Sequence, residues 1–196
     1  NALYHLFQFF DALRRTKADH PSATMPTEAW FGAADLKLSY VLADLRRVAR
    51  EMLLGQVEHR EQVRCLGFKE IRYLESVERF DEYVAFLRDI FPNALFIVNR
   101  RDQDEVVASG FWADLPSEEA LAQLRSVDKI FDRLSTLHPD VFELGYSDLT
   151  LESDRLRALY EKLGAHFSPD TVDAVLGEVH SYAPKQEYIR NLSNKG

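Results

Sequence analysis

Two residues that can bind an oxyanion follow an apolar segment in the middle of the chain. Residues 94–98 read Ala-Leu-Phe-Ile-Val, a run typical of a strand that is buried on both faces. Arg101 comes shortly after it, and Ser109 lies eight residues beyond Arg101. Open α/β sheets bind ligands at the carboxyl ends of their strands, and a guanidinium can hold phosphate or sulfate through two parallel hydrogen bonds. The spacing therefore predicts a phosphate or sulfate site at Arg101 and Ser109. The alternative is an exposed Arg–Asp pair and a serine packed on a helix.

The elements that must position this site alternate between helices and strands. Apolar residues at helical spacing predict helices over residues 2–13, 33–54, 80–90, 102–109, 116–137, 151–163 and 169–176. Short apolar runs predict strands over residues 63–68, 94–98 and 141–146. This alternation is typical of an α/β fold with a parallel sheet. We expect one domain over residues 1–196, in three layers, with a parallel sheet flanked by helices.

Composition restricts the class of protein and its partners. The chain has 13 Phe, 8 Tyr and 2 Trp, too many aromatic residues for a disordered chain. Its formal net charge of −8 argues against a general nucleic-acid or anionic-membrane partner. Cys65 is the only cysteine, which excludes an internal disulfide and a CxxC zinc motif. A reducing, cytoplasmic location is the simplest expectation. The six histidines show no paired ligand spacing, so we expect no metal site.

The segment from Arg101 to Ser109 resembles the sulfotransferase family, whose members use 3′-phosphoadenosine 5′-phosphosulfate as the sulfuryl donor. That family has an apolar strand, an Arg, usually Asp/Asn-Pro, and a Ser eight positions after the Arg. Here Gln103 stands where Pro is common. The resemblance implies that Arg101 and Ser109 bind the 3′-phosphate of the cofactor. It also implies the sheet topology of the P-loop nucleotide hydrolases.

Two further segments resemble the same family in the same order. Residues 66–73 resemble its strand that ends in a lysine, which implies that Lys69 is catalytic and stabilises charge on the sulfuryl group or the leaving phosphate. Ile71 stands where the cytosolic branch has a catalytic histidine, so that assignment fails here. Residues 144–149 resemble its Tyr-Glu-Asp-Leu segment, which implies that Tyr146 lies beside the adenine. The alternatives are a surface salt bridge for Lys69 and a core tyrosine at a strand end for Tyr146.

The chain departs from the family at its front. Sulfotransferases carry a Gly-, Ser- and Thr-containing phosphate-binding loop near the N-terminus, and no Gly-rich loop occurs in these 196 residues. We expect the N-terminal strand and loop of the family to be missing from this sequence. In the tail, Lys185, Arg190 and Lys195 are candidates to cover the 3′-phosphate, although none of them matches a pattern.

These expectations define one function and two alternatives. The expected reaction moves a sulfuryl group to a hydroxyl or amine of a small-molecule or glycan acceptor, without a metal, a nucleic acid or a membrane as partner. The base that accepts the proton is unassigned, and the sequence predicts no oligomeric state. One alternative is a kinase-like phosphotransferase, although the chain has no Walker lysine motif. The other is a degenerate, non-catalytic binding module of the same fold.

Overall fold

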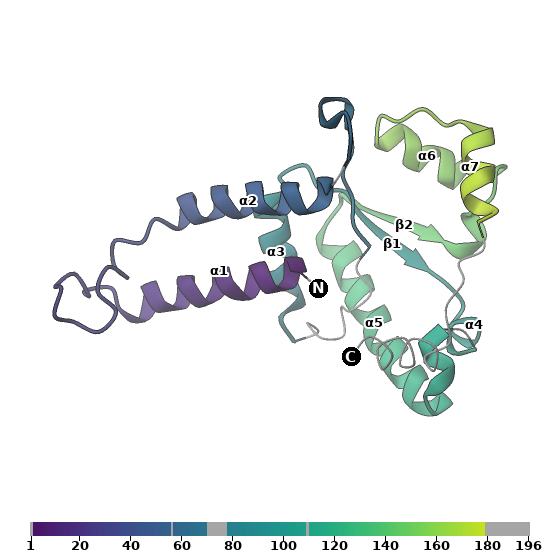
Figure 1. Cartoon of the computed structure of the whole chain (residues 1–196). Coiled ribbons are helices and arrows are strands. Elements are labelled where there is room, and N and C mark those ends of the chain that lie inside the picture. Colours follow the sequence, from purple (N-terminus) through teal and green to yellow (C-terminus); the bar gives the residue numbers. More distant parts are fainter. Residues whose placement is uncertain (1, 56, 70–77, 109, 179–196) are drawn as a thin grey trace, which may run out of the picture. The chain divides into compact units, whose positions relative to one another are not determined.

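The computed structural model describes residues 2–55, 57–69, 78–108 and 110–178. The chain divides into two units, Asn1–Leu95 and Phe96–Gly196, which we describe separately (Figure 1). The first unit is helical, and the second contains a parallel sheet with helices. The expectation of a mixed helix–strand fold with a parallel sheet is therefore confirmed.

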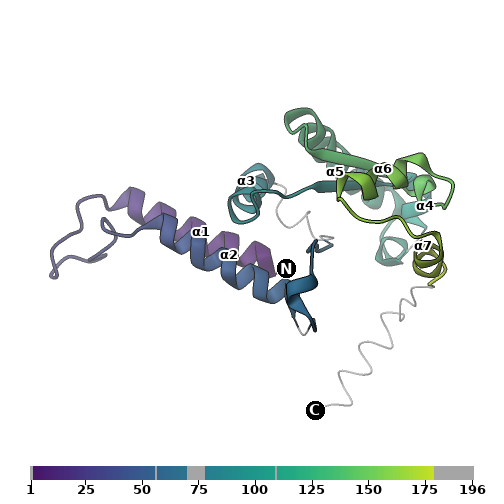
Figure 2. The ribbon, with the colours of Figure 1, turned by 90° about the horizontal axis from the view of Figure 1, so that it is seen from above.

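Unit 1 is built on a hairpin of two long helices and a third helix that packs against both. Helix α1 covers Ala2–Asp19, α2 covers Leu38–Leu54 and α3 covers Phe80–Ile90, and a short 3-10 helix covers Arg60–Gln62. Helices α1 and α2 run side by side in opposite directions (Figures 1 and 2). Helix α2 ends at Gly55, whose positive φ of 51° suits glycine and whose N–H donates to the carbonyl of Glu51.

Aromatic rings fill the junction between α1 and α3. The ring of Phe7 lies 5.6 Å from that of Tyr83 and 5.8 Å from that of Phe86, centre to centre. Tyr4 meets Tyr83 edge to face at 5.3 Å. These separations are favourable for aromatic pairs, so the periodic apolar residues of both helices form one core.

Unit 2 contains the two strands that were expected in the second half of the chain. Strand β1 covers Phe96–Arg100 and β2 covers Val141–Gly145, and they pair in parallel from Phe96 opposite Val141 to Arg100 opposite Gly145. The helices of this unit are α4 (Gln103–Val107), α5 (Ser117–Leu137), α6 (Asp154–Lys162) and α7 (Pro169–Leu176). The 3-10 turns Gly110–Asp114 and Tyr146–Asp148 complete it. Because α4 and α5 lie between the strands in the chain, they form the crossover that parallel pairing requires.

The strand expected over residues 63–68 is wrong. The segment forms no strand, and Leu66 and Phe68 are 40% and 41% exposed. An apolar run becomes a strand only when it pairs with a neighbouring strand, and residues 63–68 do not belong to the described sheet. The sheet of the described residues consequently has two strands rather than three.

The expected start of the second helix is also wrong. Residues 29–35 form successive turns, and α2 begins at Leu38 rather than at Ala33. Lys37, the residue before the helix, has an extended backbone with φ −92° and ψ 90°. The turns before it are therefore not continuous with α2, and the helix can begin only at Leu38.

Candidate functional site

Arg101 and Tyr146 meet where the two strands end. Because Arg100 pairs with Gly145, the next residues of both strands emerge side by side at the carboxyl edge of the sheet. The guanidinium carbon of Arg101 lies 4.4 Å from the centre of the Tyr146 ring, a cation–π contact. Tyr146 is 51% exposed, so it is not the core tyrosine that was the alternative expectation. The structure thus brings together two residues that the sequence assigned to one ligand.

Two short caps hold the backbone on either side of this pair. The Asp102 carboxylate accepts hydrogen bonds from the N–H groups of Asp104 (3.0 Å) and Glu105 (3.2 Å), which begins α4 directly after Arg101. On the other strand, the N–H of Gly145 donates to the Asp148 carboxylate at 2.8 Å and closes the turn that carries Tyr146. A Cβ at residue 145 would lie 3.1 Å from Oδ2 of Asp148, so this turn favours glycine.

One carboxylate shares the Arg101 guanidinium. Its Nε donates to Oε2 of Glu105 at 2.9 Å. This hydrogen bond, followed by the negative charge of Glu105, raises the pKa of Arg101, so the group is cationic at every pH at which the protein is folded. The bond uses one of the five N–H donors of a guanidinium. In the described part of the chain no other group accepts from Arg101, so its Nη1 and Nη2 donors remain available to an anionic ligand.

The neighbouring Arg100 uses its Nη atoms to hold β1 to α5 and β2, while its buried Nε has no hydrogen-bond partner in the described part of the chain. Its Nη2 lies 2.8 Å from Asp132 and 3.1 Å from Glu143, and its Nη1 lies 3.6 Å from Asp128. The Ser135 hydroxyl donates to Glu143 at 2.5 Å. This bond, together with the one from Arg100, holds the pKa of Glu143 below its ordinary value. Three carboxylates therefore make Arg100 a structural residue, in contrast to Arg101.

The remaining predicted residues are not joined to this pair. Ser109 lies outside the described residues, as do Lys185, Arg190 and Lys195. Lys69 is exposed and lies in unit 1, at the end of the segment that forms no strand. The geometry around the candidate site is thus defined for Arg101 and Tyr146 alone.

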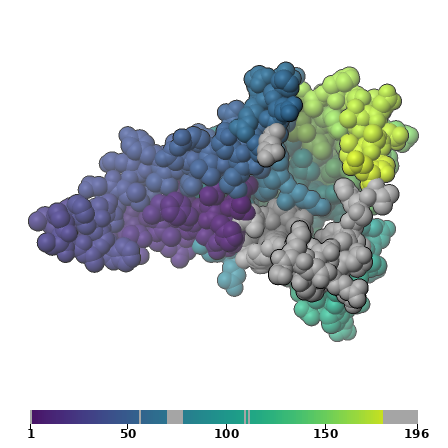
Figure 3. Space-filling view, viewed as in Figure 1, coloured from purple at the N-terminus to yellow at the C-terminus, as the bar shows by residue number. Residues whose placement is uncertain are grey.

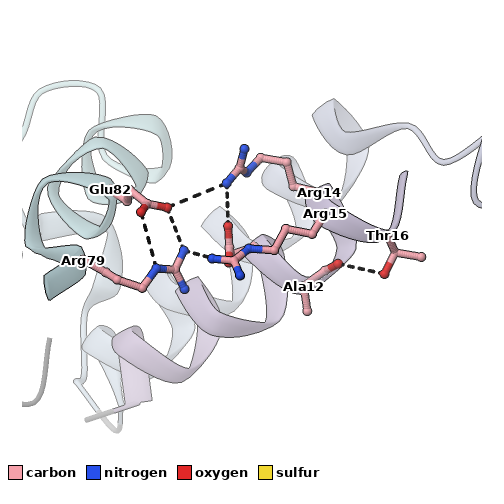
Figure 4. A network of polar contacts seen from close by, with 7 residues as sticks. Ala12, Arg14, Arg15, Thr16, Arg79 and Glu82 are labelled. Carbon is pink, nitrogen blue, oxygen red and sulfur yellow. Dashed lines mark hydrogen bonds and ion pairs between the residues drawn. The ribbon is translucent and has the colours of Figure 1, made fainter. Parts of the chain in front are cut away.

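A second polar cluster was missed from the sequence. The Asp11 carboxylate in α1 is surrounded by three guanidiniums, with Arg14 at 2.7 Å, Arg15 at 2.8 Å and Arg79 at 2.7 Å. Arg79 also binds Glu82 at 2.7 Å (Figure 4). Arg14 and Arg15 are visible in the sequence as helical neighbours of Asp11, but Arg79 is brought there only by the packing of α3. The cluster fastens α1 to the start of α3.

Within the described ranges, no group of three or more His, Cys, Asp or Glu residues is arranged to hold a metal ion. None of the helices in those ranges combines the length and the apolar composition needed to cross a bilayer.

The chain was also compared with known proteins. No family model matches it, and neither does any curated protein or any solved structure.

Proposed function

We propose that this chain is part of a sulfotransferase that uses 3′-phosphoadenosine 5′-phosphosulfate as its sulfuryl donor. The single observation that carries the proposal is the contact between Arg101 and Tyr146 at the carboxyl edge of the parallel sheet. The resemblance of the sequence assigns these residues to the 3′-phosphate and to the adenine of one cofactor. In this proposal the two observed strands belong to a three-layer, P-loop-like α/β fold.

The chemistry of the two side chains suits a phosphorylated adenosine. The free Nη donors of Arg101 can bind a phosphate in the two-pronged manner that guanidinium favours. The exposed surface of the Tyr146 ring can stack against a purine. Ser109, eight residues after Arg101, would add a hydroxyl donor to the same phosphate. Glu105 would stay hydrogen-bonded to Nε of Arg101, because the phosphate would bind to Nη1 and Nη2.

The proposed reaction needs positioning and charge stabilisation rather than a metal-bound nucleophile. The bound cofactor supplies the sulfuryl group. An acceptor hydroxyl or amine forms a bond to sulfur while the bond from sulfur to the 5′-phosphate oxygen breaks, and the acceptor proton passes to a base. Lys69 is the proposed group that stabilises charge on the transferred sulfuryl or on the leaving phosphate. Arg101 and Tyr146 would act by holding the cofactor in place.

Calorimetric titration with 3′-phosphoadenosine 5′-phosphate tests the proposal. We expect the full chain to bind it more tightly than adenosine 5′-phosphate, because Arg101 contacts the 3′-phosphate. The variant Arg101→Ala should lose about tenfold or more in affinity for the bisphosphate, and with it the preference between the two nucleotides. The matched control is Arg157→Ala, which removes another exposed guanidinium 4.4 Å from an aromatic ring, that of Phe167. This control should bind like the unmodified chain.

Three outcomes would overturn the proposal. Absence of binding by the full chain would favour a non-catalytic module. Equal losses in Arg101→Ala and Arg157→Ala would mean that the pair at the strand ends is not the site. Tight binding of ATP with Mg²⁺, without any preference for a 3′-phosphate, would favour the kinase-like alternative.

A further inference from the structure

Helix α2 carries an apolar strip that neither α1 nor α3 covers. Val48 and Met52, one helical turn apart, are 41% and 43% exposed. On the same helix, Leu45 and Ala49 are buried. Part of the surface of α2 faces the viewer in the space-filling view (Figure 3). Arg47 and Glu51 border the strip, and these four residues line one shallow depression.

We infer that the four residues Arg47, Val48, Glu51 and Met52, here called the α2 patch, bind the same patch of a second copy of this chain. The two α2 helices would run antiparallel about a twofold axis. At 100° per residue, Arg47 and Glu51 lie on one flank of the helix, and Val48 and Met52 lie beside them. A twofold axis perpendicular to the helices places this flank of one α2 against the same flank of the other α2, which runs in the opposite direction.

The charges of the patch are complementary to themselves in this arrangement. With the axis at the level of residue 49, Arg47 of each copy faces Glu51 of the other, and the apolar residues meet between the helices. A different partner would have to offer an acid, a base and two apolar side chains at helical spacing. A second copy supplies this set by symmetry, which is why we commit to it as the occupant.

The charged residues can change partners at little cost. Arg47 binds Asp44 at 3.0 Å, and Glu51 binds Arg60 at 2.6 Å, within the same chain. All four side chains of these pairs are largely exposed to solvent, and exposed ion pairs are weak. The patch is also small compared with the surface that a permanent dimer buries. We therefore expect a weak, reversible dimer whose population rises with protein concentration.

Sedimentation velocity across a range of protein concentrations tests the inference. The unmodified chain should shift from monomer toward dimer as the concentration rises. Each of the single variants Arg47→Glu and Glu51→Arg should raise the dissociation constant by about tenfold or more, because like charges then face each other. Arg50→Glu is the matched control, since it reverses a charge on α2 outside the patch. This control should dimerise like the unmodified chain.

Mixing the two single variants separates the inference from a folding defect. One variant presents two acids and the other two bases, so an equimolar mixture should form a heterodimer although each variant alone stays monomeric. The double variant, with both charges exchanged, should regain the homodimer. A monomeric unmodified chain at every concentration would overturn the inference, and so would single variants that dimerise normally or a mixture that fails to associate.

Discussion

The Nη2 atom of Arg79 lies 2.7 Å from Oδ2 of Asp11, so one ion pair joins the residue that precedes α3 to the middle of α1. Asp11 is only 4% exposed, and it is the one charged residue buried in the described part of the chain. The guanidinium of Arg79 also lies 4.7 Å from the centre of the Phe7 ring. The pair therefore sits at the edge of the aromatic core and fixes how α1 and α3 meet.

Replacing Asp11 with Asn should destabilise unit 1. The amide keeps the shape of the side chain but leaves three guanidiniums without their shared counter-ion. We expect the free energy of unfolding to fall by about 2 kcal/mol, since hydrogen bonds to charged groups are among the stronger ones. Urea unfolding followed by circular dichroism measures the loss. Asp44→Asn, which breaks an exposed pair with Arg47, should cost less than about 1 kcal/mol. Equal losses in the two variants would contradict a special role for Asp11.

The same cluster should make unit 1 sensitive to acid. Burial acts to raise the pKa of Asp11, but hydrogen bonds from Arg14 and Arg79 outweigh it and hold the pKa below the ordinary 3.8. The hydrogen bond from Arg79 holds the pKa of Glu82 below its ordinary 4.5. As the pH falls through the ordinary pKa values, these two carboxylates bind protons in the unfolded chain but stay ionised in the folded chain. The stabilisation from these two carboxylates is complete at pH values above their ordinary pKa values of 3.8 and 4.5. It is lost as the pH falls through their lower pKa values in the folded protein.

Urea unfolding of the unmodified chain and of Asp11→Asn at a series of pH values checks this dependence. The unmodified chain should lose stability steeply below about pH 4.5, while the variant, which lacks one of the titrating groups, should show a shallower slope. Parallel slopes in the two proteins would show that Asp11 titrates normally in the folded state.

Two adjacent arginines should respond differently to the same substitution. Arg100→Ala removes the cation shared by Asp128, Asp132 and Glu143, and it should lower the free energy of unfolding by about 2 kcal/mol. Arg101→Ala should lower the free energy of unfolding much less, because it removes only the ion pair with Glu105 and a contact with the exposed Tyr146 ring. Differential scanning calorimetry of both variants makes the comparison. A large loss of stability in Arg101→Ala would mean that the residue is structural and would weaken its assignment as a ligand-binding group.

The Asp102 cap should matter for the position of Arg101. Its carboxylate accepts from two N–H groups at the start of α4, so Asp102→Ala leaves both donors without that partner and should cost about 1 kcal/mol. Asp102→Ser, which retains an N-cap acceptor, should restore most of that loss. Thermal unfolding measures the stability of these variants. Titration with 3′-phosphoadenosine 5′-phosphate measures their affinity for the nucleotide. If the Ala variant is as stable as the unmodified chain, the cap does not hold α4.

The helices of this protein were largely predictable because their signals are local. Helix α3 has the predicted bounds, and α7 begins after Ser168, whose hydroxyl caps it, with Pro169 in its first turn. The start of α2 was not predictable from apolar spacing, because residues 33–35 form turns and Lys37 has an extended backbone, neither of which apolar spacing reveals. The strand expected at residues 63–68 failed because strand formation depends on a pairing partner that an apolar run does not reveal.

The candidate site could be predicted from the sequence only in part. Arg101 and Tyr146 were identified separately, and the parallel register of β1 and β2 is enough to bring them together, although β1 lies two residues later than the predicted 94–98. The structural role of Arg100 was not visible, because its carboxylate partners come from α5 and β2, far along the chain. The clustering of arginines around Asp11 was not visible in the sequence either, because it requires α3 to pack on α1.

The parallel pairing of β1 and β2 sets an order of events during synthesis. Helices α1 and α2 follow one another in the chain, so their contacts can form as soon as both have been made. Strand β1 finds no partner in the described chain except β2, and the whole of α4 and α5 must emerge from the ribosome before β2 does. Until then β1 has no strand of the described sheet with which to pair. The sheet of the second unit therefore requires more of the chain to be synthesised than the α1–α2 contact of the first unit does.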